Sequence, residues 1–337
     1  MVFARNHVIC HNWCWRLEYQ KTAKTWTDNS RLSRPLVTIG MCVRNCEDYL
    51  QSAIESIFHQ DFVHESMELI FVDDGSTDGT LKLIRDAVRK SDIHFKIFEG
   101  SWKGIGHARN MVVRNARGCF ILWVDGDMVL SKDYVRQLVN FMNNHPEVGI
   151  VKGSQSLQLG GNLLATLEAY SRAASRMVDY RSKTSRAKAL GTGGSICRIK
   201  AVKQVGGFDE NLQGYGEDWD IELRVRDAGW SLDTINAEFS DHERRPLSWK
   251  KLWFRYWLRG YCSHYFLHKN VGLLELYRLS PISALITGLL YSRKLYPLIK
   301  KKTAFLLPFE NSFKMLAWYL GFFESHLDSY EPSCTKM

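Results

Sequence analysis

The sequence predicts an α/β protein built on a mostly parallel, Rossmann-like sheet flanked by helices, and two observations predict it. Apolar runs of strand length alternate with segments of helical periodicity from residue 35 onward. The apolar runs are nearly continuous, which is typical of strands buried on both faces of a parallel sheet. At 337 residues, the chain is long enough to bury a large core.

The individual elements follow in order after Pro35. Strands are predicted where short apolar runs are bounded by polar turns, at 36–43, 68–72, 94–100 and 120–124. Helices are predicted where apolar residues recur three or four positions apart, at 44–60, 81–90, 107–118, 131–146 and 163–181. Gly118 is expected to close the third helix and Ser131 to cap the fourth.

Two acidic clusters stand directly after predicted strands. Asp73 and Asp74 follow the second strand, and Asp125 and Asp127 follow the fourth. In open parallel sheets, ligands bind beyond the carboxyl ends of the strands. We therefore expect both clusters to face one crevice.

The Asp-Gly-Asp sequence suits a hard divalent cation. Alternation along a strand would point Asp125 and Asp127 the same way, and Mg²⁺ takes one or two carboxylates together with substrate phosphates. Gly126 would let phosphates approach the backbone. A solvated Asp-Gly turn is the alternative, and this motif alone does not decide between the two.

A basic segment, KGIGHARN, precedes the fourth strand. It has Gly104 and Gly106, but Arg109 occupies the place of a third glycine, and the segment follows the third strand. Both features argue against a dinucleotide-binding fingerprint. Lys103, His107 and Arg109 are instead suited to an anionic ligand.

A third acidic cluster, GEDWD, opens a predicted helix. Carboxylates at a helix N-terminus are stabilised by the helix dipole, which is one explanation of Glu217, Asp218 and Asp220. A carboxylate at this position is equally well suited to act as a general base.

Six motifs stand in a specific order: LVTIGMCVRNCEDYLQSAIESIFHQ, ELIFVDDGSTDGT, KGIGHARN, ILWVDGDM, GTGGSICRIKAVKQVGGFDENL and GEDWDIELRVRDAGW. Together they resemble a family 2 glycosyltransferase of the GT-A fold, over about residues 35–242. The resemblance implies transfer of a hexose-type sugar from a nucleotide-diphosphate sugar, with inversion at the anomeric carbon.

The resemblance also implies roles for single residues. Asp74 is expected to bind the base and Arg109 to support the donor. A metal ion, Mg²⁺ or Mn²⁺, is expected on Asp125 and Asp127, with Asp127 the direct ligand and Asp125 also on the donor side. Asp218 matches the catalytic base.

Further residues are assigned by their place in the same motifs. His242 is expected to be a third metal ligand or a phosphate contact, with a surface histidine as the alternative. Cys42 stands where relatives often carry a small hydroxyl residue, which leaves uracil and guanine open as the base. The remaining residues are Val43, Asn45 and Lys103 on the donor side, and Glu217, Gly193 and Gly194 on the acceptor side.

Charge divides the chain into an N-terminal extension (1–34), a catalytic domain (35–242) and a basic aromatic tail (243–337). The catalytic domain has 24 Lys and Arg against 28 Asp and Glu, whereas the tail has 15 against 6. A predicted helix at 248–266 combines a stripe of Lys251, Arg255 and Arg259 with a broad aromatic face. This pattern favours an amphipathic helix at a membrane interface, and packing on the catalytic domain is the alternative.

Two further apolar runs, 282–292 and 315–323, are shorter than the roughly 20 residues of a spanning helix. Pro281, Pro297 and Pro308 divide this region. We therefore expect segments that lie on a membrane surface, with contacts spread over 248–323. A buried interface of a homo-oligomer would give a similar pattern and stays open.

The first residues, MVFARNHVICHNWC, contain no continuous apolar segment of the kind found in a secretory signal. A cytoplasmic protein, peripheral on the cytoplasmic face of the membrane, is expected. Four residues here, His7, Cys10, His11 and Cys14, have a compressed spacing for a zinc site.

Two other functions compete with the transferase. A nucleotidyltransferase would need a phosphate loop rich in glycine and arginine, which these motifs do not resemble. A non-catalytic glycan- or nucleic-acid-binding protein would use the basic aromatic tail. The acidic core speaks against a nucleic acid partner. For the transferase, the tail favours a polyprenyl-linked or glycan acceptor.

Overall fold

The computed structural model describes residues 24–27, 35–157, 160–175, 189–212, 215–241, 246–270 and 280–328. His242 and the four residues considered for zinc lie outside these ranges. Of the proposed N-terminal extension, β1 (Lys24–Thr27) is described, and it pairs antiparallel with the edge of the sheet.

The described residues form one nine-stranded sheet in the order β1-β4-β3-β2-β5-β8-β7-β9-β6. Neighbours among β4, β3, β2 and β5 are parallel, as predicted, but β8 and β6 run antiparallel to their partners, so the whole sheet is mixed. The strand bounds are β2 Val37–Val43, β3 Met67–Asp73, β4 His94–Glu99, β5 Phe120–Trp123, β6 Met128–Leu130, β7 Val148–Gln155, β8 Ser195–Arg198 and β9 Ser231–Asp241.

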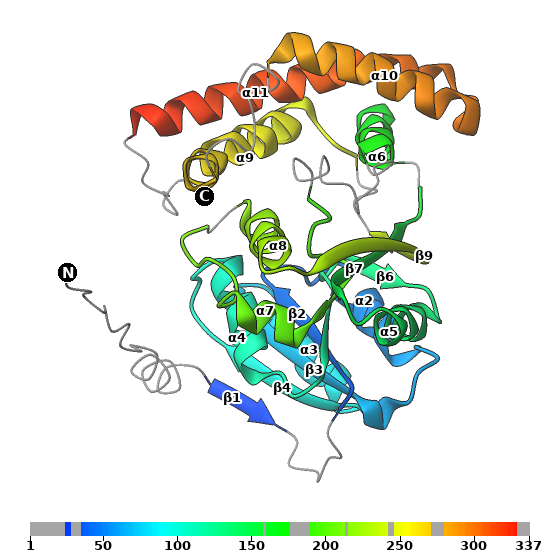
Figure 1. Cartoon of the computed structure of the whole chain (residues 1–337), viewed down its shortest axis with the longest axis vertical. Coiled ribbons are helices and arrows are strands. Elements are labelled where there is room, and N and C mark those ends of the chain that lie inside the picture. Colours follow the sequence, from blue (N-terminus) through cyan, green and yellow to red (C-terminus); the bar gives the residue numbers. More distant parts are fainter. Residues whose placement is uncertain are drawn as a thin grey trace, which may run out of the picture.

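Helices cover both faces of this sheet (Figure 1). Those of the sheet domain are α2 Leu50–Phe58, α3 Thr80–Val88, α4 Ile105–Asn115, α5 Tyr134–Asn144, α6 Leu163–Ser175, α7 Ile199–Gln204 and α8 Glu217–Asp227, with a short 3₁₀ turn η2 at His64–Ser66. Two of the predicted helix boundaries were wrong. Helix α4 stops at Asn115, and the amide of Gly118 instead donates to Oγ1 of Thr38. Asp133 stands at the N-cap of α5 in place of Ser131.

Two apolar clusters fill the space between sheet and helices. Residues of β3 alternate between them, because successive side chains of a strand point to opposite faces. Helices α2, α3 and α5 pack in the first cluster, and α4, α7 and α8 pack in the second. Gly40 permits the close approach of α4, since a Cβ there would lie 2.8 Å from Cγ1 of Val112.

The tail folds into three helices, α9 Trp249–Lys269, α10 Pro281–Ile299 and α11 Leu307–Leu327, with the 3₁₀ turn η5 at Lys302–Leu306. They form a layer at one end of the sheet domain, and α8 lies beneath α9 (Figure 1). Pro297 lies inside α10, and Pro308 stands in the first turn of α11. The two apolar runs are therefore parts of longer helices.

Helix α9 corrects the expectation of an aromatic face on the membrane. Much of that face packs on α11, where the indole of Trp257 donates to Glu324 at 3.0 Å and the hydroxyl of Tyr261 donates to Asp328 at 2.7 Å. The helices approach closely at Gly260 and Gly321, because a Cβ on either would overlap a backbone carbonyl of the other helix. The alternative, packing on the catalytic domain, holds at the end of α9, where Phe266 and Lys269 contact α8, whereas most of the helix packs on α11 of the tail.

Trp249 and Phe254 of α9 stay exposed, but the largest group of exposed apolar side chains lies on α10, η5 and α11. It is made of Ile282, Leu285, Ile286, Leu289, Leu290, Leu298, Phe305, Leu306, Phe309, Leu316, Tyr319, Leu320 and Phe323; we call these residues the apolar face. Exposed cations stand beside it at Arg293, Lys294 and 300–302. Within the described ranges, no helix is both long and apolar enough to cross a bilayer.

A pH-sensitive contact also joins α9 to α11. His264 is fully buried, and its Nε2 lies 3.2 Å from Nδ1 of His326. Burial, followed by the nearby His268 and His326, lowers the pKa of His264 to about 4. Between about pH 6.5 and pH 4, the unfolded chain therefore binds more protons at this histidine than the folded protein does. Neutral His264 thus contributes to the free energy of unfolding above pH 6.5, and this contribution is lost as the pH falls through 4.

We therefore expect His264→Gln to flatten the acid side of the stability curve. Thermal melting followed by circular dichroism at pH 7.5 and at pH 4.5 measures the drop in each protein. His59→Gln, at an exposed position after α2, is the matched control and should keep the wild-type drop. An equal drop in wild type and His264→Gln would contradict the assignment.

Candidate active site

The two carboxylates of the Asp-Gly-Asp motif lie in a turn, not on a strand. Strand β5 ends at Trp123, and the amide of Met128 donates to the carbonyl of Asp125 at 3.0 Å to close the turn into β6. The argument from strand alternation was therefore wrong for this pair, although the motif does stand at the carboxyl end of β5. Asp125 is exposed and Asp127 is half-buried.

Asp74 holds a neighbouring loop. Its Oδ1 and Oδ2 accept the backbone amides of Lys103 and Gly104, at 2.9 and 3.0 Å. Its own amide donates to the carbonyl of Val43. Each carboxylate oxygen can accept a further hydrogen bond. This geometry brings the ends of β2 and β3 together with the start of α4.

Asn45 organises the turn after β3. It adopts φ +50°, its amide donates to Oγ of Ser76, and its side-chain oxygen accepts from the amide of Thr77. Two amides of this turn are thus used inside the protein, since the amide of Ser76 also donates to Asp73.

Arg109 is buried among acids from two segments, the start of α8 and the turn after β5. One guanidinium nitrogen donates to Oε1 of Glu217 at 2.5 Å, and Asp125 and Asp218 add to the field that raises its pKa against the effect of burial. Burial, and then repulsion from Asp218, raises the pKa of Glu217 to about 7. Through electrostatic attraction, Arg109 therefore links the turn at Asp125 to the start of α8.

Asp218 faces the turn that contains Gly191. A Cβ on Gly191 would lie 3.4 Å from Oδ2 of Asp218, while Oδ1 accepts the amide of Trp219 at 2.8 Å. Glu222, one turn further along α8, holds that segment in place by accepting the amides of Leu190 and Gly191, both at 2.8 Å. Asp218 is therefore placed by α8 on one side and by a fixed turn on the other.

Gly193 and Gly194 line the opposite side of the site. A side chain on Gly193 would collide with Oδ2 of Asp125, so glycine is needed for this approach. Gly194 has φ +75°, and its amide donates to the carbonyl of Trp123 at 2.9 Å. This segment joins the Asp-Gly-Asp turn to the acceptor side.

The donors for a metal ion fit a magnesium- or manganese-type site. Asp125 and Asp127 supply two hard carboxylates from one turn, and such ions take their remaining ligands from substrate phosphates and water. Among the described residues, no group of three or more His, Cys, Asp and Glu side chains is arranged to hold a metal. His242, expected as a third ligand, lies outside those residues.

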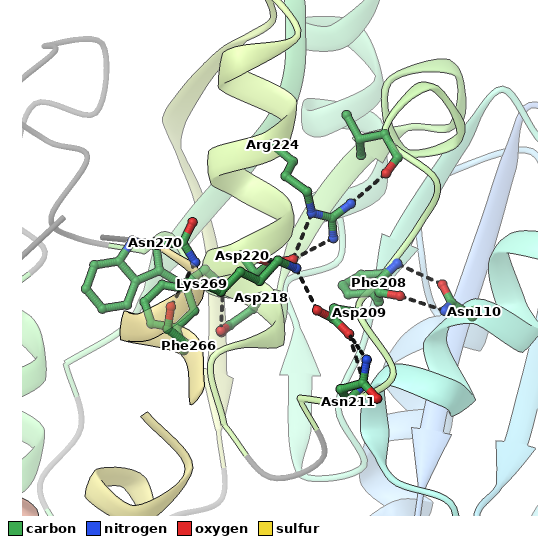
Figure 2. A network of polar contacts seen from close by, with 12 residues as sticks. Asn110, Phe208, Asp209, Asn211, Asp218, Asp220, Arg224, Phe266, Lys269 and Asn270 are labelled. Atoms are coloured by element: carbon green, nitrogen blue, oxygen red, sulfur yellow. Dashed lines mark hydrogen bonds and ion pairs between the residues drawn. The ribbon is translucent and has the colours of Figure 1, made fainter. Parts of the chain in front are cut away.

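Lys269 of the tail contacts the acids beside α8 (Figure 2). Nζ of Lys269, on α9, lies 2.6 Å from Oδ2 of Asp209 and 2.8 Å from Oδ1 of the buried Asp220. Asp220 is also held by Arg224, at 2.7 Å. Phe266 of α9 stacks on Trp219, with ring centroids 4.8 Å apart. The tail therefore fixes the turn of α8 that carries Asp218.

We expect Lys269→Gln to loosen this connection. It would leave Asp220 with one cation fewer, and an incompletely satisfied buried group costs about 1–3 kcal/mol. Melting temperature and kcat should fall, while nucleotide binding at the Asp74 and Asp125 side should stay unchanged. Lys250→Gln, exposed at the other end of α9, is the control. Unchanged melting and kcat in Lys269→Gln would contradict the connection.

The chain is similar to known glycosyltransferases in sequence and in fold. Residues 38–203 match the family model described as glycosyl transferase family 2. The sheet domain belongs to this family. An uncharacterized glycosyltransferase from Haemophilus influenzae is 34% identical over 115 residues, 34% of this chain and 45% of that protein. Poly(ribitol-phosphate) beta-N-acetylglucosaminyltransferase TarS from Staphylococcus aureus is 32% identical over 101 residues, 30% of this chain and 18% of its own length.

These sequence matches therefore span less than half the length of either relative. Solved structures extend the likeness in fold. A mannosyltransferase from Pyrobaculum calidifontis, in complex with GDP-Man and Mn²⁺, superposes with a TM-score of 0.60 at 17% identity, covering 93% of both chains. S. aureus TarS 1–349 with UDP-GlcNAc gives 0.50 at 16% identity, covering 87% of this chain and 92% of that one. At these identities the likeness concerns the fold, and it confirms the expected GT-A-like architecture.

Sequence reasoning did not assign roles to several residues around the site. Glu222 was signalled by its position four residues after Asp218, on the same helix face. Lys269 had no local signal, because its acidic partners, Asp209 and Asp220, are far away in the sequence.

Proposed function

We propose that this protein is an inverting glycosyltransferase that moves a hexose-type sugar from a nucleotide-diphosphate sugar to a lipid-linked or glycan acceptor. The observation that carries the proposal is the arrangement around Arg109, which joins the Asp-Gly-Asp turn to the helix bearing Asp218. The family membership of residues 38–203 supports it. So do GDP-Man and UDP-GlcNAc in the two structural neighbours.

The donor would lie over the ends of β2, β3 and β5. Asp74, with Val43, Asn45 and Lys103 around it, would hold the nucleoside. Asp125 and Asp127 would hold Mg²⁺ or Mn²⁺, which neutralises charge on a diphosphate leaving group when it is bound. Arg109 would add fixed positive charge behind the turn without reorganisation during the reaction.

Asp218 would act as the general base. An acceptor hydroxyl between Asp218 and the donor would lose its proton to the carboxylate as its oxygen forms a bond to the anomeric carbon. The bond from that carbon to the diphosphate would break on the opposite side. A single displacement of this kind inverts the anomeric centre, as in enzymes with one base and no second nucleophile. Glu217, Gly193 and Gly194 would border the acceptor.

The apolar face would rest on a membrane surface with anionic headgroups. Its size favours contact with an apolar medium, and the adjacent cations at Arg293, Lys294 and 300–302 favour negative charge, at about 1 kcal/mol each. Cosedimentation should show binding to vesicles with phosphatidylglycerol and less to phosphatidylcholine alone. Equal binding to both, or none, would contradict an electrostatic membrane contact.

The test of the activity is a donor screen on the purified chain. Thermal shifts with UDP, GDP, ADP, CMP and dTDP, each with and without Mn²⁺, identify the base, since a ligand at 100 times its Kd adds about 2.7 kcal/mol of stability. The matching nucleotide sugars are then assayed for release of the nucleoside diphosphate. Stabilisation by one nucleotide and turnover of its sugar is the expected result. Absence of both for every donor would overturn the proposal.

A further inference from the structure

A cavity of about 410 Å³ lies between the catalytic helix and the tail. Tyr215 and Trp219 line it from the side of α8, and residues of α6, α9, α10 and α11 close it on the other sides. Its volume is within the range of sites for small ligands. None of the six donor-side residues assigned above lines it. It is therefore a second site, next to Asp218 but separate from the nucleotide.

The lining of this cavity is cationic and aromatic. Arg172, Arg259 and Lys314 contribute positive charge, and none of the described residues that line it is acidic. Arg259 lies between two aromatic rings, with its guanidinium carbon 4.8 Å from the ring centre of Tyr256 and 5.5 Å from that of Tyr215. Stacking of this kind holds a guanidinium in place with its N–H groups still directed outward. Such a lining suits an anion that carries an apolar group.

Three acids stand behind the lining and pair with two of its cations. Nζ of Lys314 lies 3.1 Å from Oε2 of Glu168 and 2.7 Å from Oε1 of Glu310, and Arg172 lies 3.3 Å from Oδ2 of Asp241. These ion pairs fix both cations in the cavity wall, whose described lining is basic and aromatic.

One donor in the cavity wall lacks a partner. Asn311 is 8% exposed, and its Oδ1 accepts from the hydroxyl of Ser171 at 2.9 Å. Its Nδ2 is buried and has no hydrogen-bond partner. Unsatisfied buried donors cost free energy and are unusual in native proteins. A bound oxygen anion would satisfy this one.

The cavity lies directly behind the apolar face. Ala284 and Thr287 line it from α10, while Leu285, Ile286 and Leu289 of the same helix are exposed on the outer side. On the inner side, Tyr215 and Trp219 of the cavity wall flank Asp218 at the start of α8. The cavity thus connects the proposed lipid surface with the catalytic base.

We propose that this cavity is an acceptor subsite that binds the phosphate group of a lipid-linked acceptor. The phosphate would lie beside Arg259 and Nδ2 of Asn311, with Lys314 adding positive charge from the cavity wall, and the lipid chain would leave along α10 toward the apolar face. A hydroxyl of the group carried by that phosphate would then reach Asp218. This inference rests on the proposed function and names the acceptor class of the same site.

The test uses the full chain and farnesyl phosphate as the probe, with farnesol and inorganic phosphate as separate arms. Binding is followed by tryptophan fluorescence, because Trp219 and Trp318 line the cavity. Farnesyl phosphate should bind at least tenfold more tightly than either other compound. Thr287→Phe, which fills the cavity, and Arg259→Gln, which removes a cation, should each weaken it at least tenfold. Leu285→Phe, on the exposed side of the same helix, should leave it unchanged.

Each other outcome has a defined meaning. Equal binding of farnesol would show an apolar pocket, and equal binding of inorganic phosphate would show an anion site without a lipid; either overturns the subsite. If Thr287→Phe leaves the affinity for farnesyl phosphate unchanged, the probe binds on the apolar face instead, which would also overturn the subsite. Nucleotide binding, measured in every variant, separates the two proposals. Sugar transfer without binding of farnesyl phosphate to the cavity would overturn the subsite and leave the proposed function standing. Binding of farnesyl phosphate to the cavity without any donor binding or turnover would overturn the proposed function.

Discussion

Asp218→Asn should reduce sugar transfer by about 10² to 10⁴-fold, the usual contribution of a general base. The amide keeps the shape of the side chain but cannot accept the acceptor proton. The fold should persist, since the charge of Asp218 raises the pKa of Glu217 and its removal relieves that repulsion. The rate of nucleoside diphosphate release in the presence of acceptor measures the effect.

The control for this prediction is Asp227→Asn, an exposed position at the far end of the same helix. It makes the same chemical change on α8 without touching the site, so it should keep wild-type activity. Nucleotide binding should be unchanged in both variants. A turnover of Asp218→Asn within threefold of wild type would show that another group is the base.

Asp127→Asn should remove the metal-dependent part of donor binding. With Mn²⁺ and a nucleotide concentration of 100 times Kd, the free energy of unfolding of the wild type should rise by about 2.7 kcal/mol. If the variant binds the nucleotide a hundredfold more weakly, the same concentration should raise it by only about 0.4 kcal/mol. Turnover should fall by at least about 100-fold, since a metal contributes several kcal/mol to stabilising a leaving group. Thermal shifts with and without Mn²⁺ measure the first effect.

Asp86→Asn on α3 is the matched control, because Asp86 is a half-exposed carboxylate away from the site whose partner, Arg89, is on the surface. It should keep the Mn²⁺-dependent shift. The same shift in wild type and Asp127→Asn would mean that the Asp-Gly-Asp motif is a structural turn. That alternative was open in the sequence, and the observed turn between β5 and β6 is compatible with either reading.

Much of the sheet was predictable because its signals are local. The apolar runs at 36–43 and 68–72 became β2 and β3 within a residue. Asp74 and Asp125 come together because both follow parallel strands, which end at the same edge. The antiparallel β8 was not predictable in this way, since strand direction depends on the path of the chain through residues far from the strand itself.

By itself, the sequence determined the family, the sheet edge that carries the carboxylates and the helical nature of the tail, because each depends on a motif or period within one segment. Only the tertiary structure decided which partners these segments have. Arg109 meets Glu217 across 108 residues, and the aromatic side of α9 packs on α11 through Gly260 and Gly321. Arg259 consequently faces a cavity and not a membrane. An amphipathic pattern shows that a helix has two sides, but which side is buried depends on the surface that the rest of the fold presents to it.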